Sequence, residues 1–521
     1  MLRTLRDLAR LFHAARVLAR HDALVPREFA CKLPPQLRLA RAVLGRGRIA
    51  DNDLAPGVRL ALALESLGPA YIKLGQLLAT RPDIIGEETA LALAALQDRL
   101  PPFPTELARA EVESALGAPL ETMYASFDEP IAAASIAQVH RATTSDEPAH
   151  AVAVKILRPA VEAEFARDLS AFAFAARWAE RFSAEARRLR VVAVVDTLAA
   201  SVAMELDLRM EAAAASELAE RTQRDEEFRV PEVDWQRTAA RVLTTEWVEG
   251  TPVRSAHELE SAGHDPKKVA VLVVRQFLTQ ALRDGFFHAD MHQGNLFVDA
   301  DGRLVCVDFG IMGRLDVAMR RFMAETLAGF LDRDYQRVAN VHYEAGFVSR
   351  LHPAPLFAQA LRAIGEPVFG RRANSVSMAK LLEQLFDTTR RFDMALQPQL
   401  VLLQKTMVVV EGVARGLDPE LDIWEAARPV IERWMIGQVG PEARLRDAAD
   451  GLNALGRLAR EFPLLLHNAE VVSTMLADGG LRLHPDTALQ IAQAQVARTR
   501  HVRIALWIAA GALAVLAIGM L

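Results

Sequence analysis

The strongest constraint on this 521-residue chain is the string from His288 to Asn295, which reads His-Ala-Asp-Met-His-Gln-Gly-Asn. Asp290 stands five residues before Asn295 and eighteen residues before Asp308, the first residue of an Asp-Phe-Gly triplet. This spacing is typical of phosphoryl transfer, in which one Asp orients or deprotonates the attacking hydroxyl while an Asn and a second Asp bind magnesium. We therefore predict that Asp290 is catalytic and that Asn295 and Asp308 bind Mg²⁺ across the phosphates of ATP.

Short apolar runs surround these residues. Residues 304–307 (Leu-Val-Cys-Val) predict a buried strand that leads into the triplet, and residues 296–298 predict its hairpin partner across an Asp-Gly turn. The alternative is a polar loop beside an ordinary hairpin. The register of the preceding Asp and Asn with the triplet favours the functional interpretation.

One lysine lies inside an apolar run. Residues 151–157 (Ala-Val-Ala-Val-Lys-Ile-Leu) predict a strand that contains Lys155. Only seven of the 61 basic residues are lysines, which makes a lysine in such a run informative. We predict that Lys155 binds the α- and β-phosphates of ATP. The alternative is an edge-strand lysine whose charged end reaches solvent.

A single helix is predicted from Asp196 to Arg221, with Asp196 as its N-cap. Asp207 and Glu211 are four residues apart and would share one face of this helix. Like charges at that spacing destabilise a helix by about 0.2–0.5 kcal/mol, so we expect this face to meet cations.

Glu211 is the predicted partner of Lys155, because a kinase cleft pairs its strand lysine with a helix glutamate. The ion pair would hold the lysine against the phosphates. The alternative is a solvated acidic face in which Glu205 pairs with Arg209 four residues later.

No glycine-rich loop precedes Lys155, and alanines stand where the backbone must approach phosphates. Alanine resists the positive φ values that glycine allows, so the nucleotide geometry should differ from that of a glycine-rich loop. A later run, residues 243–248, predicts a hinge at which the backbone of Glu246 and Val248 contacts adenine. The residues of the alanine-rich segment that we expect to contact the nucleotide are Ile131, Ala132, Ala133, Ala134, Ser135, Ile136, Ala137, Gln138 and Val139.

Two further departures from an ordinary kinase concern the segments around the cleft. Roughly fifty residues separate Lys155 from Glu211, and they include a predicted helix over residues 161–182. No long activation segment follows the Asp-Phe-Gly triplet, because Asp316 is predicted to cap a new helix at once. A protein substrate would therefore have little surface on which to dock.

An upstream segment carries another polar pair. Pro69 suits the first turn of a helix, from which Lys73 and Gln76 would project on one face. Gly75 inside this helix costs roughly 1 kcal/mol relative to Ala, which indicates that another element packs closely against it. Taken alone, the segment would be interpreted as a surface lysine and glutamine beside a small packing residue.

Together these strings resemble the UbiB-like family of atypical kinases, the aarF-domain kinases associated with ubiquinone biosynthesis. The resemblance covers about residues 55–330, and the motifs occur in the family's order and spacing. The His-Ala-Asp-Met-His string is most similar to the bacterial UbiB branch, although Gln293 stands where the family usually has proline. The matching positions are Lys73, Gly75 and Gln76 in a K-x-G-Q motif, Ala132 to Ser135 in an alanine-rich loop, and Glu205 and Asp207 in an E-x-D motif.

The fold that this resemblance implies is α+β, an atypical protein-kinase-like bilobal fold with an N-terminal helical extension, an α-rich C-lobe and a C-terminal transmembrane helix. The helical extension with the K-x-G-Q motif is expected over residues 1–115 and the N-lobe with its helical insertion over 116–250. The C-lobe and its helical extension are expected over 251–497 and a membrane anchor over 498–521.

The resemblance also implies that the K-x-G-Q helix folds over the active site. There, Lys73 with Glu205 or Asp207 would block the place of a peptide substrate. Lys73, Gln76, Glu205 and Asp207 therefore join Asp290 as expected residues of the catalytic site.

The implied function is a membrane-anchored, Mg-ATP-dependent atypical kinase or ATPase that supports ubiquinone (coenzyme Q) biosynthesis. The alternative is a nucleotide-binding pseudokinase scaffold that organises membrane-bound quinone-biosynthesis enzymes. Expected partners are membrane lipids, quinone precursors and other ubiquinone-biosynthesis proteins. Since the chain has no basic nucleic-acid motif, nucleic acid is not an expected partner.

The last eighteen residues, 504–521, carry no charge and follow Arg498, Arg500 and Arg503. A helix of that length spans about 27 Å, enough for the hydrocarbon layer of a membrane. Because basic flanks stay in the cytoplasm, we predict a bacterial inner-membrane protein whose catalytic domain faces the cytoplasm. The alternative is a buried apolar helix. The two cysteines predict neither a disulfide nor a metal site, which agrees with a reducing compartment.

The N-terminus adds a second membrane signal. Residues 1–50 contain eleven Lys and Arg against three acidic residues. Leu2, Leu5, Leu8 and Phe12 interleave with arginines in roughly helical phase, which is typical of a basic amphipathic helix at an anionic lipid surface. The alternative is a helix that docks on its own domain.

Overall fold

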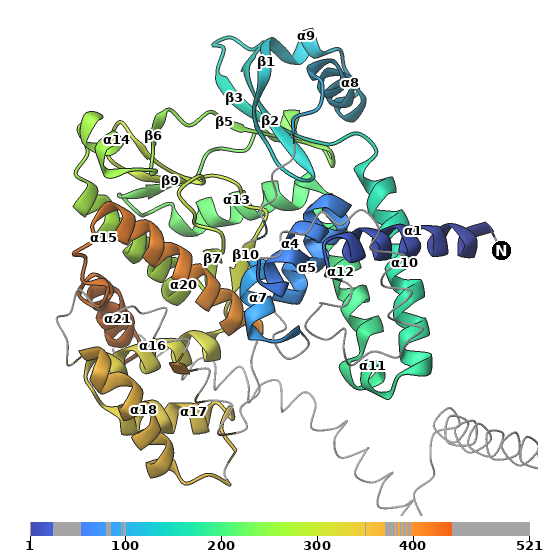
Figure 1. Ribbon diagram of the computed structural model, residues 1–521. Helices are drawn as coiled ribbons and strands as arrows, with labels where there is room; N and C mark the ends of the chain where they lie inside the picture. Colours follow the sequence, from blue (N-terminus) through green and yellow to red (C-terminus); the bar gives the residue numbers. More distant parts are fainter. Residues whose placement is uncertain are drawn as a thin grey trace, which may run out of the picture. The chain divides into compact units, whose positions relative to one another are not determined.

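The structure is a computed structural model (Figure 1). It describes residues 2–23, 54–79, 85–94, 101–349, 351–369 and 398–439, together with the single positions 96, 381, 384, 385, 388 and 392. Residues Met1–Met435 form one compact unit, which contains every sheet and the candidate site described below. The predicted mixture of helix and sheet in a kinase-like arrangement is confirmed.

The N-lobe sheet is antiparallel, with the strand order β1-β2-β3-β5. Its strands are β1 (Tyr124–Ala133), β2 (Ala137–Thr144), β3 (Ala151–Leu157) and β5 (Val242–Glu246). Because side chains alternate along a strand, Val152, Val154 and Ile156 of β3 pack into the core beneath helix α8 (Thr105–Leu116), with α9 (Leu120–Met123) beside it. Lys155 consequently projects from the opposite face of the sheet, as the predicted strand requires.

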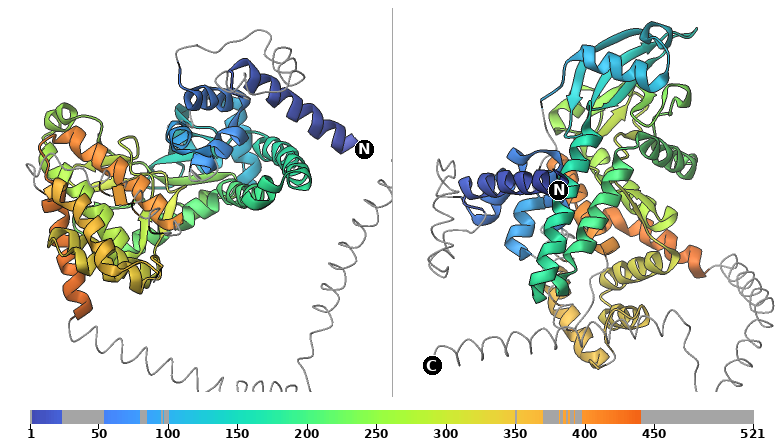
Figure 2. Two further views of the ribbon diagram at one scale, coloured as in Figure 1. Left: turned by 60° about the horizontal axis from the view of Figure 1, so that its bottom comes forward. Right: turned by 90° about the vertical axis from the view of Figure 1, so that its right-hand side faces the viewer.

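A layer of helices packs beside this sheet. Within it, Tyr71 of α5 and Phe172 of α10 contact each other edge to face, with ring centroids 4.8 Å apart. The further views in Figure 2 show α1 lying across α10, and the bounds of α10 match the predicted helix. The helices are α1 (Leu2–Arg20), α4 (Pro56–Leu67), α5 (Pro69–Ala79), α7 (Glu87–Ala94), α10 (Val161–Phe182), α11 (Ala184–Leu189), α12 (Val191–Glu205) and α13 (Leu208–Thr222).

The prediction of one helix from Asp196 to Arg221 is wrong. Asp196 lies inside α12, and the chain leaves the helix after Glu205. Asp207 then adopts an extended backbone, and its carboxylate accepts the Arg209 N–H at 3.1 Å, which makes it the N-cap of α13. Asp207 and Glu211 therefore do not repel each other along one helix, and Glu211 lies in the first turn, where an acidic side chain is favourable.

The C-lobe contains a second sheet of order β4-β9-β8-β6 and a small pair formed by β7 and β10. The predicted hairpin is confirmed by β8 and β9, which turn at Gly302 with φ 81°. The predicted cap is also confirmed, because Asp316 Oδ1 accepts the Met319 N–H at 2.7 Å at the start of α16. The strands are β4 (Phe228–Arg229), β6 (Gly250–Pro252), β7 (Phe286–His288), β8 (Leu296–Asp299), β9 (Leu304–Cys306) and β10 (Met312–Arg314).

Helices surround the C-lobe sheets. Val273 and Phe277 of α15 pack with Phe287 and Leu296 in the main core, and α20 lies along α15 (Figure 1). The helices are α14 (Ala256–Ser261), α15 (Pro266–Thr279), α16 (Val317–Leu331), α17 (Tyr335–Glu344), α18 (Ala354–Phe369), α20 (Pro398–Leu417) and α21 (Ile423–Val439). Two short turns are η1 (Trp235–Arg237) and the π-helical η2 (Gln280–Asp284).

The described helices include none that combines the length and apolar character needed to cross a membrane. The predicted anchor over residues 504–521 lies outside the described residues. The transmembrane helix and the predicted domain boundaries therefore stay predictions.

Candidate active site

Three predicted nucleotide-binding residues meet between the lobes. Lys155 Nζ on β3 donates to Glu211 Oε1 and Oε2 at 2.8 and 2.9 Å, and to Asp308 Oδ1 at 2.9 Å. The lysine and glutamate are mostly buried, whereas the Asp308 side chain is 49% exposed. The predicted pairing of Lys155 with Glu211 is present. Lys155, the predicted phosphate ligand, also contacts Asp308, a predicted magnesium ligand.

The electrostatics of this cluster follow from one cation between two carboxylates. Burial opposes the charge on Lys155, but Asp308 and Glu211 outweigh it and hold the pKa of the lysine above its ordinary value. The Lys155 ammonium holds the pKa of Asp308 well below its usual range. Burial, assisted by the nearby Asp308, raises the pKa of Glu211 to about 7. Lys155 and Asp308 are thus charged at neutral pH, as the predicted binding of phosphate and of a cation requires.

The Asp-Phe-Gly triplet is held in an unusual backbone conformation. Asp308 has φ 64°, in the left-handed region that Asp tolerates better than most residues. Phe309 is buried, and its ring lies edge-on to that of His288 at 5.5 Å between centroids. The buried ring anchors the triplet, while the positive φ turns the Asp308 carboxylate toward Lys155.

The catalytic loop is organised by His288, a residue to which the sequence analysis gave no role. His288 is fully buried; its Nδ1 accepts the Asp290 N–H at 3.1 Å and its Nε2 lies 3.2 Å from the Val307 carbonyl. An acceptor at Nδ1 and a donor at Nε2 require the neutral ring, and burial lowers the pKa of His288 accordingly. His288 therefore fixes the backbone at Asp290 and ties it to the strand that leads to the triplet.

Asn295 completes the loop. Its side-chain Nδ2 donates to the main-chain carbonyl of Asp290 at 3.1 Å, and its main-chain carbonyl accepts the Val307 N–H at 2.9 Å. Because the amide nitrogen is used in this way, Oδ1 is the side-chain atom that remains to bind a cation.

The residues present fit magnesium held jointly with ATP. Mg²⁺ prefers oxygen ligands and is usually bound through one or two side chains completed by phosphates and water. The Asp308 carboxylate and Asn295 Oδ1 form such a set. Within the part of the chain that the structure describes, no group of three or more His, Cys, Asp or Glu residues forms a self-sufficient metal site.

The alanine-rich segment forms the tight connection between β1 and β2. The Ala134 N–H donates to the Ala137 carbonyl at 2.8 Å, and Arg158 Nη2 donates to the Ala134 carbonyl at 2.9 Å. None of the predicted loop residues from Ile131 to Val139 has a positive φ, so the turn is built without the freedom of glycine.

Gln138 and Ser135 lie deeper than the predicted contact with nucleotide suggests. The Gln138 side chain is fully buried and exchanges hydrogen bonds of 2.9 and 3.2 Å with the backbone of Phe103. Ser135 is also buried, and its hydroxyl has no hydrogen-bond partner among the described residues. The Gln138 side chain therefore supports the N-lobe, and the loop backbone remains the candidate for contact with phosphates.

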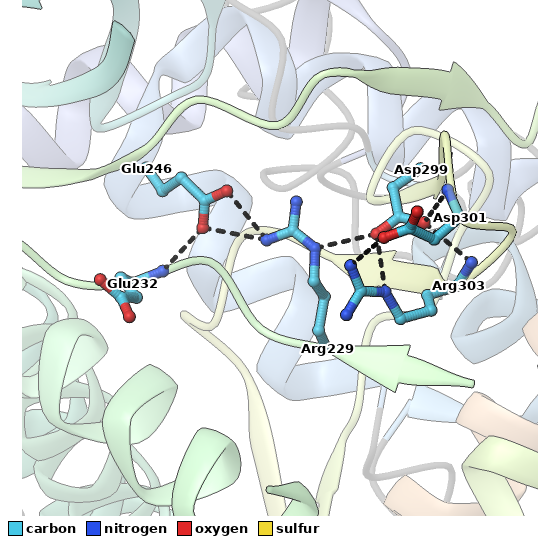
Figure 3. Close-up of polar contacts among 6 residues, drawn as sticks. All are labelled: Arg229, Glu232, Glu246, Asp299, Asp301 and Arg303. Atoms are coloured by element: carbon cyan, nitrogen blue, oxygen red, sulfur yellow. Dashed lines mark hydrogen bonds and ion pairs between the residues drawn. The ribbon is translucent and has the colours of Figure 1, made fainter. Parts of the chain in front are cut away.

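The predicted hinge is already engaged at Glu246. Its N–H donates to the Glu232 carbonyl at 2.8 Å, and its carboxylate oxygens each accept a bond of 2.9 Å from Arg229 Nη1 (Figure 3). Adenine recognition at this residue is thus limited to its carbonyl oxygen. Val248, two residues later, offers an N–H for which the described residues supply no hydrogen-bond partner.

The K-x-G-Q residues lie on α5. Lys73 Nζ is 2.7 Å from Glu205 Oε2 at the end of α12, and both side chains are largely buried. Asp207 does not join them; it binds Arg209 at 2.9 and 2.7 Å, which also excludes the alternative pairing of Glu205 with Arg209. Gln76 is partly buried on the same helix.

The close approach predicted at Gly75 is confirmed. A Cβ atom there would lie 2.5 Å from Leu96 Cδ1 and 2.8 Å from Leu64 Cδ1, inside van der Waals contact. Glycine at this position allows α5 to pack tightly against α4 and the residues that follow α7.

A bilobal mixed fold with a strand lysine paired to a helix glutamate, a catalytic-loop Asp and an Asp-Phe-Gly triplet defines a kinase-like protein. Residues 95–342 match the model of the ABC1 atypical kinase-like domain, and residues 361–422 match the UbiB helical domain. The chain belongs to the UbiB family of atypical kinases.

Two relatives support this assignment. The chain is 40% identical over 469 residues to "Probable protein kinase UbiB" of Marinobacter nauticus and 38% identical over 472 residues to the protein of that name from Shewanella sp. (strain W3-18-1). Each match covers 89% of this chain and 85% of the relative. The solved structure of the Rv3197–erythromycin complex from Mycobacterium tuberculosis is 25% identical and covers 71% of this chain and 93% of that chain, with a TM-score of 0.44, too low to support a fold argument.

The sequence analysis missed the contribution of the UbiB helical domain to the site. Thr406 on α20 is fully buried, and its hydroxyl lies 3.1 Å from the Ala289 carbonyl in the catalytic loop and 2.9 Å from the Leu402 carbonyl of its own helix, so the two carbonyls share its one proton. A lone threonine in an amphipathic helix gives no sequence signal for a contact that spans 117 residues.

Proposed function

We propose that this protein is an atypical kinase or ATPase that uses Mg-ATP and supports ubiquinone (coenzyme Q) biosynthesis. The observation that carries the proposal is the cluster of Lys155, Glu211 and Asp308, joined through the β8–β9 hairpin to Asn295 and Asp290. The relatives named as probable UbiB kinases support the choice of pathway.

The residues divide the work in a defined way. Lys155, kept charged by its carboxylate neighbours, binds the α- and β-phosphates, while Asp308 and Asn295 hold the metal ion. Magnesium, when bound, offsets the negative charge that spreads over the transferred phosphoryl group. Asp290 accepts the proton of the attacking hydroxyl or orients a water molecule, and His288 keeps the Asp290 backbone in place.

Nucleotide binding should rearrange one contact. In the structure Lys155 donates a hydrogen bond to Asp308. This bond has to break before Asp308 could bind the metal ion and Lys155 could bind phosphate. We propose that Lys155 then moves its bond to phosphate, while Glu211 holds the lysine throughout.

The acceptor is proposed to be water or a small molecule, a quinone precursor among them. Helix α16 begins at Val317, six residues after Ile311, and the intervening β10 pairs with β7. So short a segment leaves little backbone for a protein substrate to pair with. This favours a small acceptor over a polypeptide.

The rival function is a nucleotide-binding pseudokinase scaffold for quinone-biosynthesis proteins. It would explain why Lys155 and Asp308 bind each other so closely, because a silent site has no need of Asp308 for catalysis. Both proposals require nucleotide binding. They differ in the turnover of ATP, which only the kinase or ATPase carries out.

The test is phosphate release from ATP by the purified full chain in liposomes that contain anionic lipid and a quinone-precursor analogue, with Asp290→Asn as the comparison variant. Release that increases with lipid and is lost in the variant is the expected result. Tight magnesium-dependent ATP binding without release would favour the scaffold.

We further propose that the protein acts at the bacterial inner membrane with its catalytic domain in the cytoplasm. Besides the apolar residues 504–521, α1 exposes Leu5 and Phe12, at 60% and 61%. The end of α10 exposes Trp178 and Phe182, at 54% and 70%. Aromatic side chains flanked by arginines suit a membrane interface with anionic headgroups.

This membrane proposal is tested by flotation of the full chain with vesicles of phosphatidylcholine and phosphatidylglycerol. Trp178→Glu with Phe182→Glu is expected to reduce the bound fraction. The matched control is Leu351→Glu, because Leu351 is 90% exposed as a single apolar residue elsewhere. Equal flotation of the two variants and the wild type would contradict a role for α10.

A further inference from the structure

A chain of ion pairs joins the end of β5 in the N-lobe to the β8–β9 turn in the C-lobe (Figure 3). Arg229 on β4 lies at its centre. Its Nη1 donates to both carboxylate oxygens of Glu246 at 2.9 Å, and its Nε donates to Asp299 Oδ2 at 3.0 Å. One guanidinium therefore binds a carboxylate from each lobe.

The C-lobe end of this chain is rigid. Asp299 Oδ1 accepts the backbone N–H groups of Asp301 and Arg303 at 3.1 and 2.9 Å, and Oδ2 also accepts Arg303 Nε at 3.1 Å. The Asp299 side chain is only 6% exposed. Arg229 thus holds a carboxylate whose other bonds already fix the turn of the hairpin.

The same hairpin carries both proposed magnesium ligands at its opposite end. Asn295 immediately precedes β8, and Asp308 follows β9 by two residues, with the Val307 N–H donating to the Asn295 carbonyl at 2.9 Å. The backbones of β8 and β9 pair along the length of the hairpin, from Leu296 with Cys306 to Val298 with Leu304, so its two ends belong to one hydrogen-bonded unit. Moving its turn would therefore move the metal end.

The N-lobe end of the chain is the predicted adenine hinge. Glu246 is the last residue of β5, lies opposite Val152 of β3 in the sheet, and precedes Val248 by two residues. The carboxylate that Arg229 binds therefore belongs to the same residue whose carbonyl remains for adenine.

The geometry suits arginine in particular. A guanidinium offers several donors in a fixed plane, so it holds two carboxylates in a more defined relative orientation than the rotatable donors of a lysine ammonium. Arg229 is 24% exposed, so the network is partly shielded from water. An isolated exposed pair would contribute little, but here the bonds fix the relation between two elements.

We propose that Arg229 is a positioning residue that sets the distance between the adenine-binding and metal-binding halves of the ATP site. This inference rests on the proposed function, because it assumes that the hinge and the hairpin serve one nucleotide. Arg229 touches neither half of the ligand in this account; it acts through Glu246 and the hairpin.

The proposal has a signature that a general loss of structure would not produce. A ligand that spans both halves of a site binds tightly only when the halves are correctly spaced, whereas a ligand of one half is insensitive to the spacing. ATP with magnesium spans both halves. Adenosine probes the hinge alone, and magnesium tripolyphosphate probes the metal end alone.

The experiment measures the affinity of the full chain for these three ligands by calorimetric titration, in the wild type, Arg229→Gln and Arg229→Lys. We expect Arg229→Gln to weaken Mg-ATP binding by on the order of tenfold, and adenosine and Mg-tripolyphosphate binding by less than about twofold. Arg229→Lys keeps the positive charge but loses the planar set of guanidinium donors. Its affinity for Mg-ATP should lie between those of the wild type and Arg229→Gln.

The matched control is Arg303→Gln. Arg303 binds the same Asp299 and also Asp301, but it stays within the hairpin and does not reach the N-lobe. It should leave all three affinities within about twofold of the wild type.

Two results would overturn the positioning role: an unchanged Mg-ATP affinity in Arg229→Gln, or parallel losses for all three ligands in both Arg229 variants. Failure of the part of the proposed function on which this inference rests, the binding of Mg-ATP at this site, looks different, because the wild type would then bind none of the three ligands.

Discussion

Two lysine–glutamate pairs lie on either side of the break between α12 and α13. Lys73 and Glu205 join the K-x-G-Q helix to the end of α12, whereas Lys155 and Glu211 join the N-lobe sheet to the start of α13. The atoms approach to 2.7 and 2.8 Å, so distance does not distinguish them.

The difference lies in what surrounds each pair. Lys155 also binds Asp308, a half-exposed carboxylate that follows the C-lobe hairpin, so this pair connects to the proposed magnesium ligands. The Lys73 pair connects two helices of the layer beside the N-lobe. The comparison shows that two lysine–glutamate pairs of similar geometry can differ in what they connect: one joins two helices, and the other joins the N-lobe sheet to Asp308.

Among changes at these two pairs, the largest expected effect comes from removing Asp308, the further carboxylate that Lys155 binds. Asp308→Asn keeps the shape of the side chain but removes the charge that binds Lys155 and that we propose binds the metal ion. We expect Mg-ATP hydrolysis to fall by about 10²–10³-fold, with loss of magnesium-dependent nucleotide binding. Phosphate release and calorimetric titration measure the two effects.

Asp301→Asn is the matched control, since Asp301 lies on the same hairpin and its side chain is 71% exposed. It should hydrolyse ATP like the wild type. Normal hydrolysis by Asp308→Asn as well would remove Asp308 from the site.

A smaller effect is expected from breaking the other pair. Lys73→Met leaves Glu205 without this cation in a largely buried position, which should lower the free energy of unfolding by about 1–3 kcal/mol. Mg-ATP affinity should stay within about twofold. Chemical denaturation and nucleotide titration of the same preparation provide the two values.

The comparison variant is Lys155→Met, which should lose Mg-ATP affinity because Lys155 is the proposed phosphate ligand. If Lys73→Met lost nucleotide binding to the same degree as Lys155→Met, the two pairs would not differ in role as described.

The smallest effect concerns the break that separates the two glutamates. Asp207→Ala removes the N-cap of α13 and should cost about 1 kcal/mol of unfolding free energy. Asp196→Ala should cost nearly nothing, because Asp196 is exposed inside α12 and caps nothing. Thermal melts of both variants measure the contrast, and an equal loss in both would argue for the single helix expected from sequence.

Much of the site could be predicted because its chemistry restricts the residue types. A lysine in an apolar strand, a glutamate on a later helix and an Asp-Phe-Gly triplet identify partners 56 and 153 residues apart in the chain. The strand around Lys155 and the hairpin before Asp308 followed from apolar runs and an Asp-Gly turn, which are local signals.

The rest depended on contacts that no local pattern contains. The break at Asp207 arises partly because the Leu208 N–H donates to the Ala240 carbonyl at 2.9 Å, outside the helix. The bond from Arg229 to Asp299 depends on the parallel pairing of β4 with β9, which brings together strands far apart in sequence. The helical periodicity of the sequence continues through the break at Asp207. No periodicity indicates the long-range bond that Arg229 makes.

The most direct test of the central claim, that the Lys155 cluster and the catalytic loop turn over Mg-ATP, is the Asp290→Asn variant. Its Mg-ATP affinity and its phosphate release should be measured on one preparation beside the wild type. We expect affinity within about threefold of the wild type and release lowered by about 10²–10⁴-fold, because Asp290 acts on the proton and not on the nucleotide. Release equal to that of the wild type would contradict this assignment of the active site.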